Sequence, residues 1–79
     1  MSLVDRIDAD PRILCGKPCI RGTRLAVEFI LDLLAAGETN EDLLENYPGL
    51  TLEDIQACIA YASLLVKRVR ADSASERVN

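Results

Sequence analysis

The sequence has no histidine, and its three cysteines, Cys15, Cys19 and Cys58, form no Cys-x-x-Cys pair. A zinc site of three or four ligands therefore has too few donors, and we expect no metal and no other cofactor. We expect the thiols to be reduced and to serve packing, as is usual in the cytoplasm. The sequence also lacks a nucleophile paired with a general base, and GKP (16–18) lacks the spacing of a phosphate-binding loop. These absences argue against an enzyme, and we expect no catalytic residue.

Long hydrophobic runs are missing as well. No segment approaches the roughly 20 apolar residues that span a bilayer, and the first residues, MSLVDRID, lack the basic and apolar regions of a signal peptide. We therefore expect a cytoplasmic protein without a membrane partner. Aromatic residues make up 4% of the 79 residues, against 49% for all hydrophobic types. This balance favours one small, mostly helical domain, for which oligomerisation is a common source of stability.

Turn signals predict a β-hairpin near the N-terminus. Two short apolar runs, ILC (13–15) and CI (19–20), flank the GKP segment, in which Gly16 suits a turn. The polar residues 1–12 are expected to form an arm, residues 13–70 a single domain, and the small, polar residues 71–79 a flexible tail.

Three helices are predicted after this hairpin. AVEFILDLLAA has helical periodicity over 26–36, and Gly37 follows as a C-terminal cap. Thr39 and Asp42 have the spacing of a capping box at the start of a short second helix that extends to about Asn46.

The third helix begins with the same signal, Thr51 and Asp54, and is expected to extend to about Arg70. Its apolar residues recur at helical spacing, which predicts a stripe that faces the core across several turns: Ile55, Cys58, Ile59, Ala62, Val66 and Val69.

The first helix is apolar over most of its circumference. One face carries Val27, Ile30, Leu31 and Leu34, and another carries Phe29, Leu33 and Ala36. So short a chain cannot cover both faces by itself. We therefore predict a homodimer whose interface includes Phe29, Leu33 and Ala36.

Charge is segregated along the chain. Residues 28–66 contain eight acidic residues and no lysine or arginine, whereas both ends are basic. A short second helix linked to a longer third suggests a helix-turn-helix, although ordinary packing of three helices gives the same order. Phosphate binding needs cations, so any DNA contact depends on the basic ends. The candidate DNA contacts are Lys17, Arg21, Lys67, Arg68 and Arg70, with Gln56 and Ser63 towards the bases.

Residues 10–62 resemble the bacterial family known as domain of unknown function 433, often described as antitoxin-like. The resemblance runs through Asp10-Pro11, Gly16-x-Pro18-x-Ile20-x-Gly22-Thr23-Arg24, Ala36-Gly37, Tyr47-Pro48-x-Leu50-Thr51-x-x-Asp54-Ile55 and Tyr61-Ala62. It implies a three-helix, homeodomain-like (helix-turn-helix) bundle preceded by a short N-terminal β-hairpin. It also implies a homodimer and, in many genomes, a neighbouring gene for a PIN-like nuclease.

The motif GKPCIRGTR (16–24) contains residues of two kinds. Gly16, Pro18 and Gly22 suit backbone requirements, and Thr23 suits a cap or brace before the first helix. For Arg24 two roles stay open, a bridge to Asp10 or Asp54, or contact with a partner. Lys17 is expected to be exposed at the tip of the hairpin.

Two functions follow from these observations. The first is the antitoxin of a type II toxin–antitoxin pair, which would bind operator DNA and neutralise a PIN-like nuclease. Arginine suits a carboxylate-rich nuclease site, so the candidate toxin contacts are Arg21, Arg68 and Arg70. The alternative is a dimeric protein-interaction module that does not bind DNA.

Overall fold

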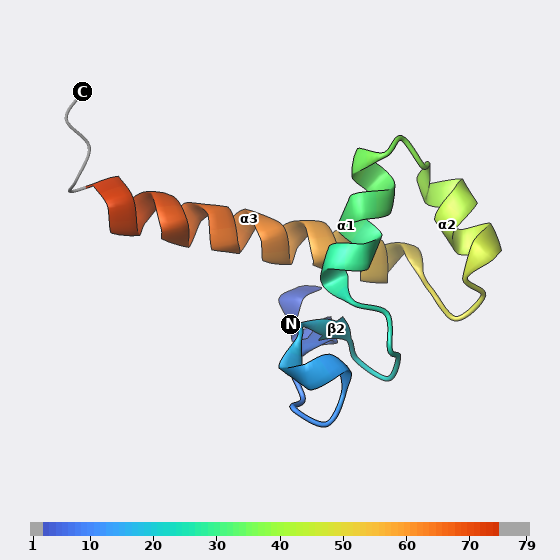
Figure 1. Ribbon diagram of the computed structural model, residues 1–79. Coiled ribbons are helices and arrows are strands. Elements are labelled where there is room, and N and C mark those ends of the chain that lie inside the picture. The colour runs from blue at the N-terminus through green and yellow to red at the C-terminus, as the bar shows by residue number, and fades with distance from the viewer. Residues whose placement is uncertain (1–2, 75–79) are drawn as a thin grey trace.

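Three helices and a two-stranded antiparallel sheet make up the computed structural model, which describes residues 3–74 (Figure 1). The N-terminal part contains two 3-10 turns, η1 (Leu3–Arg6) and η2 (Leu14–Gly16), and two strands, β1 (Ile7–Asp8) and β2 (Cys19–Ile20). Helices α1 (Val27–Ala35), α2 (Asn40–Asn46) and α3 (Leu52–Ala74) follow. The predicted fold class, mostly helical with an N-terminal hairpin, is confirmed.

The first strand of the hairpin lies earlier in the chain than predicted. β1 pairs antiparallel with β2, and Ile7 lies opposite Ile20. The run ILC was predicted to be this strand, but Leu14, Cys15 and Gly16 have positive φ angles of 50°, 56° and 84°. A left-handed backbone cannot continue a strand, so the prediction for this run was wrong.

The predicted caps are confirmed at both helix starts. The backbone N–H of Asp42 donates to Thr39 Oγ1 at 3.1 Å, and the N–H of Thr39 donates to Asp42 Oδ2 at 3.0 Å. Thr51 and Asp54 exchange the same two hydrogen bonds, both at 3.1 Å. Gly37 has a φ of 100°, as a glycine after a helix requires. These local bonds explain why the helix starts were predictable.

The hydrophobic core lies where the sheet and the three helices meet. Its largest fully buried side chains come from β2, α1, α2 and α3: Ile20, Ile30, Leu43, Ile55 and Cys58. The residues of η1 and β1 also pack against α3, so residues 3–8 belong to the folded body.

Helix α3 projects well beyond this body (Figure 1). Its 23 residues make a rod about 34 Å long, within a molecule whose longest extent is 46 Å. The helix ends at Ala74, four residues later than predicted. None of the helices in residues 3–74 combines the length and apolar character needed to cross a membrane.

Candidate protein-interaction surface

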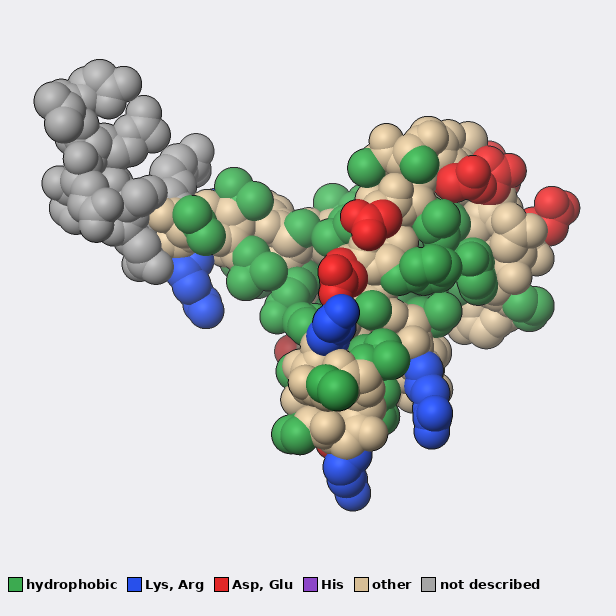
Figure 2. All heavy atoms as spheres, viewed as in Figure 1, with side chains coloured by type: hydrophobic (Ala, Val, Ile, Leu, Met, Phe, Trp, Pro, Cys, Tyr) green, Lys and Arg blue, Asp and Glu red, His purple; other side chains and the backbone are tan. Residues whose placement is uncertain are grey.

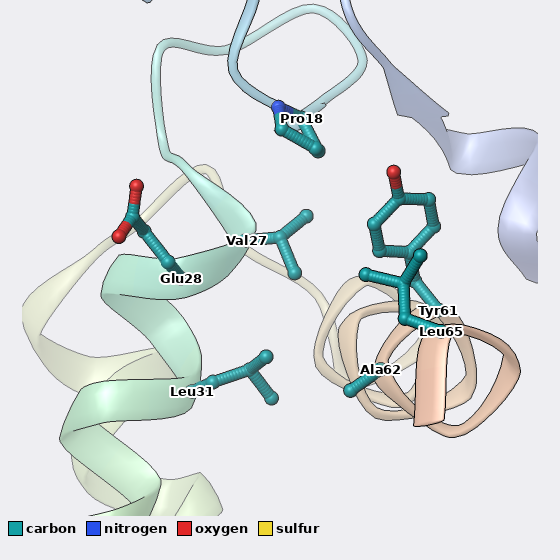
Figure 3. Close-up of a pocket in the computed structure, with 7 residues that line it drawn as sticks. All are labelled: Pro18, Val27, Glu28, Leu31, Tyr61, Ala62 and Leu65. Carbon is teal, nitrogen blue, oxygen red and sulfur yellow. The ribbon is translucent and has the colours of Figure 1, made fainter. Parts of the chain in front are cut away.

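An apolar groove lies between α1 and α3 beneath the loop that carries Pro18 (Figure 3). Its volume is about 220 Å³. We call it the α1–α3 groove; its walls are Val27, Glu28 and Leu31 of α1 and Tyr61, Ala62 and Leu65 of α3. Val27 and Leu31 point towards the α3 side in Figure 3, and Glu28 stands at the rim. The groove is therefore an apolar surface with a carboxylate at its edge.

The start of α1 is held in place by the loop above the groove. The backbone N–H of Val27 donates to the Pro18 carbonyl oxygen at 2.9 Å. Thr23 Oγ1 donates to the Ile20 carbonyl oxygen at 2.8 Å and accepts from the Leu25 N–H at 3.0 Å. Thr23 thus braces the turn before α1, one of the two roles predicted for it. The motif GKPCIRGTR accordingly positions the groove.

The exposed part of α3, residues 63–69, continues directly from the groove. Every residue of this α3 extension is exposed. Leu64, Leu65 and Val66 are 51%, 42% and 63% exposed, although burial of such side chains is strongly favourable. The predicted apolar stripe of the third helix is therefore covered only in its first half, since Ile55 and Cys58 are buried.

The charge near the α1–α3 groove differs from the charge at the far end of the α3 extension. On the face shown in Figure 2, most acidic side chains gather over α1 and α2, and a basic side chain marks the far end of α3. Lys67 and Arg68 are exposed at that end and have no ion pair among residues 3–69. The side chain of Arg70 lies outside the described part of the structure. The α3 extension is therefore apolar with a basic end.

The cations near the N-terminus are mostly bound to acids of the same chain. The Arg21 guanidinium donates two hydrogen bonds of 3.0 Å to the Asp8 carboxylate, which raises the pKa of Arg21. Lys17 lies 3.0 Å from Glu28 at the rim of the groove, and this hydrogen bond raises the pKa of Lys17. Lys17 is exposed as predicted. Lys17 and Arg21 are both in ion pairs with acids of the same chain. This weakens the case that they bind phosphate or a toxin.

Arg24 makes neither of the two bridges considered for it. Asp10 binds Arg12 at 3.0 Å, and Asp54 accepts from Arg6 at 3.2 Å. Arg24 itself is exposed, without an ion pair in the described chain. The predicted acids are thus paired with other cations, Asp10 with its near neighbour in the sequence, Arg12, and Asp54 with the distant Arg6.

Three of the remaining candidate DNA contacts fall on one side of α3, whereas Arg68 lies off that side. Gln56, Ser63 and Lys67 are all exposed, and spacings of seven and four residues place them along one stripe of the helix. Glu53 and Asp54 occupy the first turn of the same helix, where their charge repels phosphate. Lys17 is paired with α1 and Arg21 with β1, so neither side chain extends this stripe.

The predicted dimer residues Phe29, Leu33 and Ala36 lie in α1 or directly after it. Phe29 is part-exposed and meets the ring of Tyr47 edge-on, with 5.7 Å between ring centroids. Leu33 packs partly against the core, and Ala36 is exposed at the end of α1. This face is therefore already covered in part by the same chain.

The three cysteines are free thiols in different surroundings. Cys15 is exposed, and Cys19 and Cys58 are buried. Burial, with a smaller contribution from the Asp54 carboxylate, raises the pKa of Cys58 to about 11. Cys58 therefore stays protonated and unreactive at neutral pH. Among the side chains of residues 3–69, no cluster of three or more metal-ligating groups occurs.

The comparisons with known proteins assign the family. Residues 7–62 match the family described as "Protein of unknown function (DUF433)". The chain belongs to the DUF433 family. The uncharacterised protein y4eO of Sinorhizobium fredii is 39% identical over 56 residues, which are 71% of this chain. The match covers 25% of that relative, so this chain spans only about a quarter of its length.

A crystal structure of a DUF433 member from Anabaena variabilis has the same fold. It is 32% identical to this chain, with a TM-score of 0.74. The superposition covers 87% of this chain and 68% of the Anabaena chain.

The sequence analysis did not predict that the residues of the α1–α3 groove form one site. Periodicity places Leu31 on the core face, and it assigns no role to Tyr61 or Leu65. A signal for Leu65 was present, because Ile55, Cys58, Ala62 and Leu65 are spaced by three, four and three residues. This is the spacing of a helix–helix seam.

Proposed function

We propose that this DUF433 protein works by binding other polypeptides, with the α3 extension as its main contact element. The observation that supports this proposal is the exposure of Leu64, Leu65 and Val66 on a helix that projects from the body. Contiguous exposed apolar surface of this kind marks interaction sites in soluble proteins. These three residues face different directions around the helix, so more than one contact can form along it.

The partner that we propose is a PIN-like nuclease, which would make the protein an antitoxin. Arg68 supports this proposal, because it is exposed and has no acidic partner in residues 3–69. A planar guanidinium pairs well with the carboxylates that hold a nuclease metal, and such a pair strengthens when water is excluded. Arg21 is the weaker candidate since it already binds Asp8.

Co-expression with the product of the neighbouring gene tests this function. We expect the wild-type chain to retain that nuclease in a pull-down and to restore growth of cells that express it. The double variant Leu64→Glu/Val66→Glu is expected to lose both effects, and Arg68→Glu to weaken them.

Leu52→Glu is the control, because Leu52 is also an exposed leucine, at 42% against 51% for Leu64, and lies at the opposite end of α3. Retention by the double variant, or equal loss with Leu52→Glu, would contradict a role for the α3 extension.

Operator binding is a second candidate function. Its support is the exposed stripe of Gln56, Ser63 and Lys67, which is neutral or basic over its length. The acidic first turn of α3 weighs against it. We therefore rank DNA binding below protein binding.

A further inference from the structure

We propose that the α1–α3 groove and the apolar stripe beyond it receive one amphipathic helix of the partner protein, bound antiparallel to α3. The apolar side of this helix fills the groove, its N-terminal end carries acidic residues and its C-terminal end carries basic residues. The inference rests on the proposed function only in assigning partner binding to the α3 extension. It adds the groove to that surface and names the chemistry of the segment that binds there.

The size of the groove favours side chains of a polypeptide over a small molecule. Its volume is about 220 Å³, whereas pockets for cofactors and drug-sized ligands usually measure about 300–1,000 Å³. The walls are mainly apolar, with the Glu28 carboxylate at the rim and the Tyr61 hydroxyl on the side nearer Pro18 (Figure 3). A space of this kind suits one or two aliphatic side chains that project from a bound segment.

The spacing of apolar residues on α3 favours a helix as that segment. Spacings of three, four, three and four residues define the α3 seam: Ile55, Cys58, Ala62, Leu65 and Val69. The inner residues Ile55 and Cys58 are buried in the core, and α1 packs against this part of α3.

The outer half of the seam is exposed. Leu65 and Val69 are 42% and 64% exposed, and Val66, which is 63% exposed, lies one turn from Ala62 on the same face. A partner helix placed here extends to the outer half the helix-on-helix packing that covers the inner half. It also covers Val66, one of the residues assigned to partner binding above.

The charges at the two ends of this surface set the direction of the helix. The acidic residues of α1, Glu28 and Asp32, are one turn apart and exposed, and Lys67 and Arg68 are exposed on the α3 extension. Figure 2 shows hydrophobic side chains along α3 between the acidic residues over α1 and the basic residue at the far end. The helix dipole favours acids at the N-terminal end of a helix and cations at its C-terminal end. Such a helix meets opposite charge at both ends when it lies antiparallel to α3.

The homodimer predicted from the sequence leaves this site open. Its interface residues are Phe29, Leu33 and Ala36, and none of them lines the groove. Phe29 and Leu31 are two residues apart on α1, so their side chains do not face the same way. The groove and the predicted dimer surface are therefore different sides of α1, and a partner can occupy the groove of a monomer or of that dimer.

Two synthetic peptides of identical composition test whether the site takes an amphipathic helix. Each is about 18 residues long, because shorter helices are marginal in water, and each has glutamates at its N-terminal end and lysines at its C-terminal end. One carries its leucines at heptad spacing, and the other has them scattered around the helix. Fluorescence anisotropy should give a dissociation constant below about 100 μM for the first peptide and one at least about 10-fold higher for the second.

Variants of the protein test where the peptide binds. Leu65→Glu should weaken binding at least about 10-fold, because it places a charge without a partner in the apolar contact. Leu52→Glu is the matched control, since Leu52 and Leu65 are both 42% exposed and Leu52 does not line the groove. It should change the constant less than about 2-fold. Circular dichroism should show equal helicity for both variants and the wild type.

The double variant Lys67→Glu/Arg68→Glu tests the direction of the helix. It should weaken binding of the heptad peptide about 3-fold, as the loss of exposed ion pairs predicts. It should instead strengthen binding of a heptad peptide that has lysines at both ends. The same order of affinities for both peptides in the wild type and the double variant would contradict the antiparallel direction.

Equal binding of the heptad and scattered peptides, or equal effects of Leu65→Glu and Leu52→Glu, would overturn the inference. So would a Leu65→Glu variant that loses self-association in light scattering but keeps the peptide, because a second copy would then fill the groove. The nuclease pull-down separates this inference from the proposed function. If Leu65→Glu retains the nuclease as well as the wild type does, the groove assignment is wrong and the function stands. If the heptad peptide binds as expected but the wild type retains no nuclease, the groove assignment stands and the nuclease is not the partner.

Discussion

At the scale of the residue, Asp54 combines two structural roles in one carboxylate. Its Oδ2 accepts the backbone N–H of Thr51 at the start of α3, and its Oδ1 accepts from the Arg6 guanidinium at 3.2 Å. The residue is 6% exposed, so water competes little for these bonds. Asp54 therefore joins the start of α3 to the N-terminal segment.

We expect Asp54→Ala to lower the free energy of unfolding by about 2 kcal/mol, because a helix cap and a charged hydrogen bond are removed together. Urea unfolding followed by circular dichroism measures this loss. Asp42→Ala removes the equivalent carboxylate from the exposed cap of α2, where the Thr39 backbone N–H lowers the pKa of Asp42, and should cost clearly less. Equal losses would show that the contact with Arg6 contributes nothing.

At the scale of the element, the N-terminal segment is small but structurally important. β1 has two residues and completes a sheet with β2, and η1 covers part of α3. Ile7 packs against the core cluster, whereas Leu14 in η2 is exposed. The burial of these two aliphatic residues is thus the reverse of what a hairpin beginning at residue 13 would require.

We expect Ile7→Ala to reduce stability by about 2 kcal/mol, because it removes part of the packing against the core. Leu14→Ala should change stability by less than about 0.5 kcal/mol. Thermal and urea unfolding of the two variants compare these costs directly. A larger loss for Leu14→Ala would contradict the position of β1.

At the scale of the whole molecule, the acidic residues lie mainly in the helical body, and basic residues lie at the end of the projecting helix α3. The net charge is −4, and the acidic middle of the sequence forms α1, α2 and the first half of α3. Lys67 and Arg68 stand apart from it on the α3 extension. In the described part of the chain, the cations that are exposed and have no ion pair are therefore Lys67 and Arg68 at that end and Arg24 in the N-terminal part, and DNA meets a favourable field only near them.

We expect binding to a duplex of the chain's own promoter to be weak at 150 mM salt, with a dissociation constant above about 1 μM. Replacing Lys67 and Arg68 with alanine should lower the slope of log affinity against log salt by about 0.9 for each phosphate that the protein no longer neutralises. Fluorescence anisotropy at several salt concentrations measures both quantities. Arg12→Ala, which removes a cation already paired with Asp10, is the control and should leave the slope unchanged. Nanomolar binding at 150 mM salt would favour the operator-binding function.

The helices were predictable because their signals are local. The Thr39–Asp42 and Thr51–Asp54 caps join residues three apart, and Gly37 ends α1 through its own backbone conformation. The candidate site was only partly predictable. The apolar excess of the first helix indicated an uncovered surface, but periodicity could not show that Tyr47, the residue after α2, would approach Phe29 while Leu31 remained open to the groove.

The sequence by itself determined the helix starts, the mostly helical class and the segregation of charge, since each depends on residue type and short-range spacing. Tertiary structure decided which distant segments meet. Arg6 reaches Asp54 across 48 residues, and Ile7 pairs with Ile20 rather than with a neighbour across a tight turn. Such contacts depend on how the chain packs as a whole. The favoured arrangement is the one that buries the most apolar surface, and this total cannot be read from the preferences of short segments. The same physics leaves the second half of the α3 seam exposed, because the described part of the chain holds no further element that covers it.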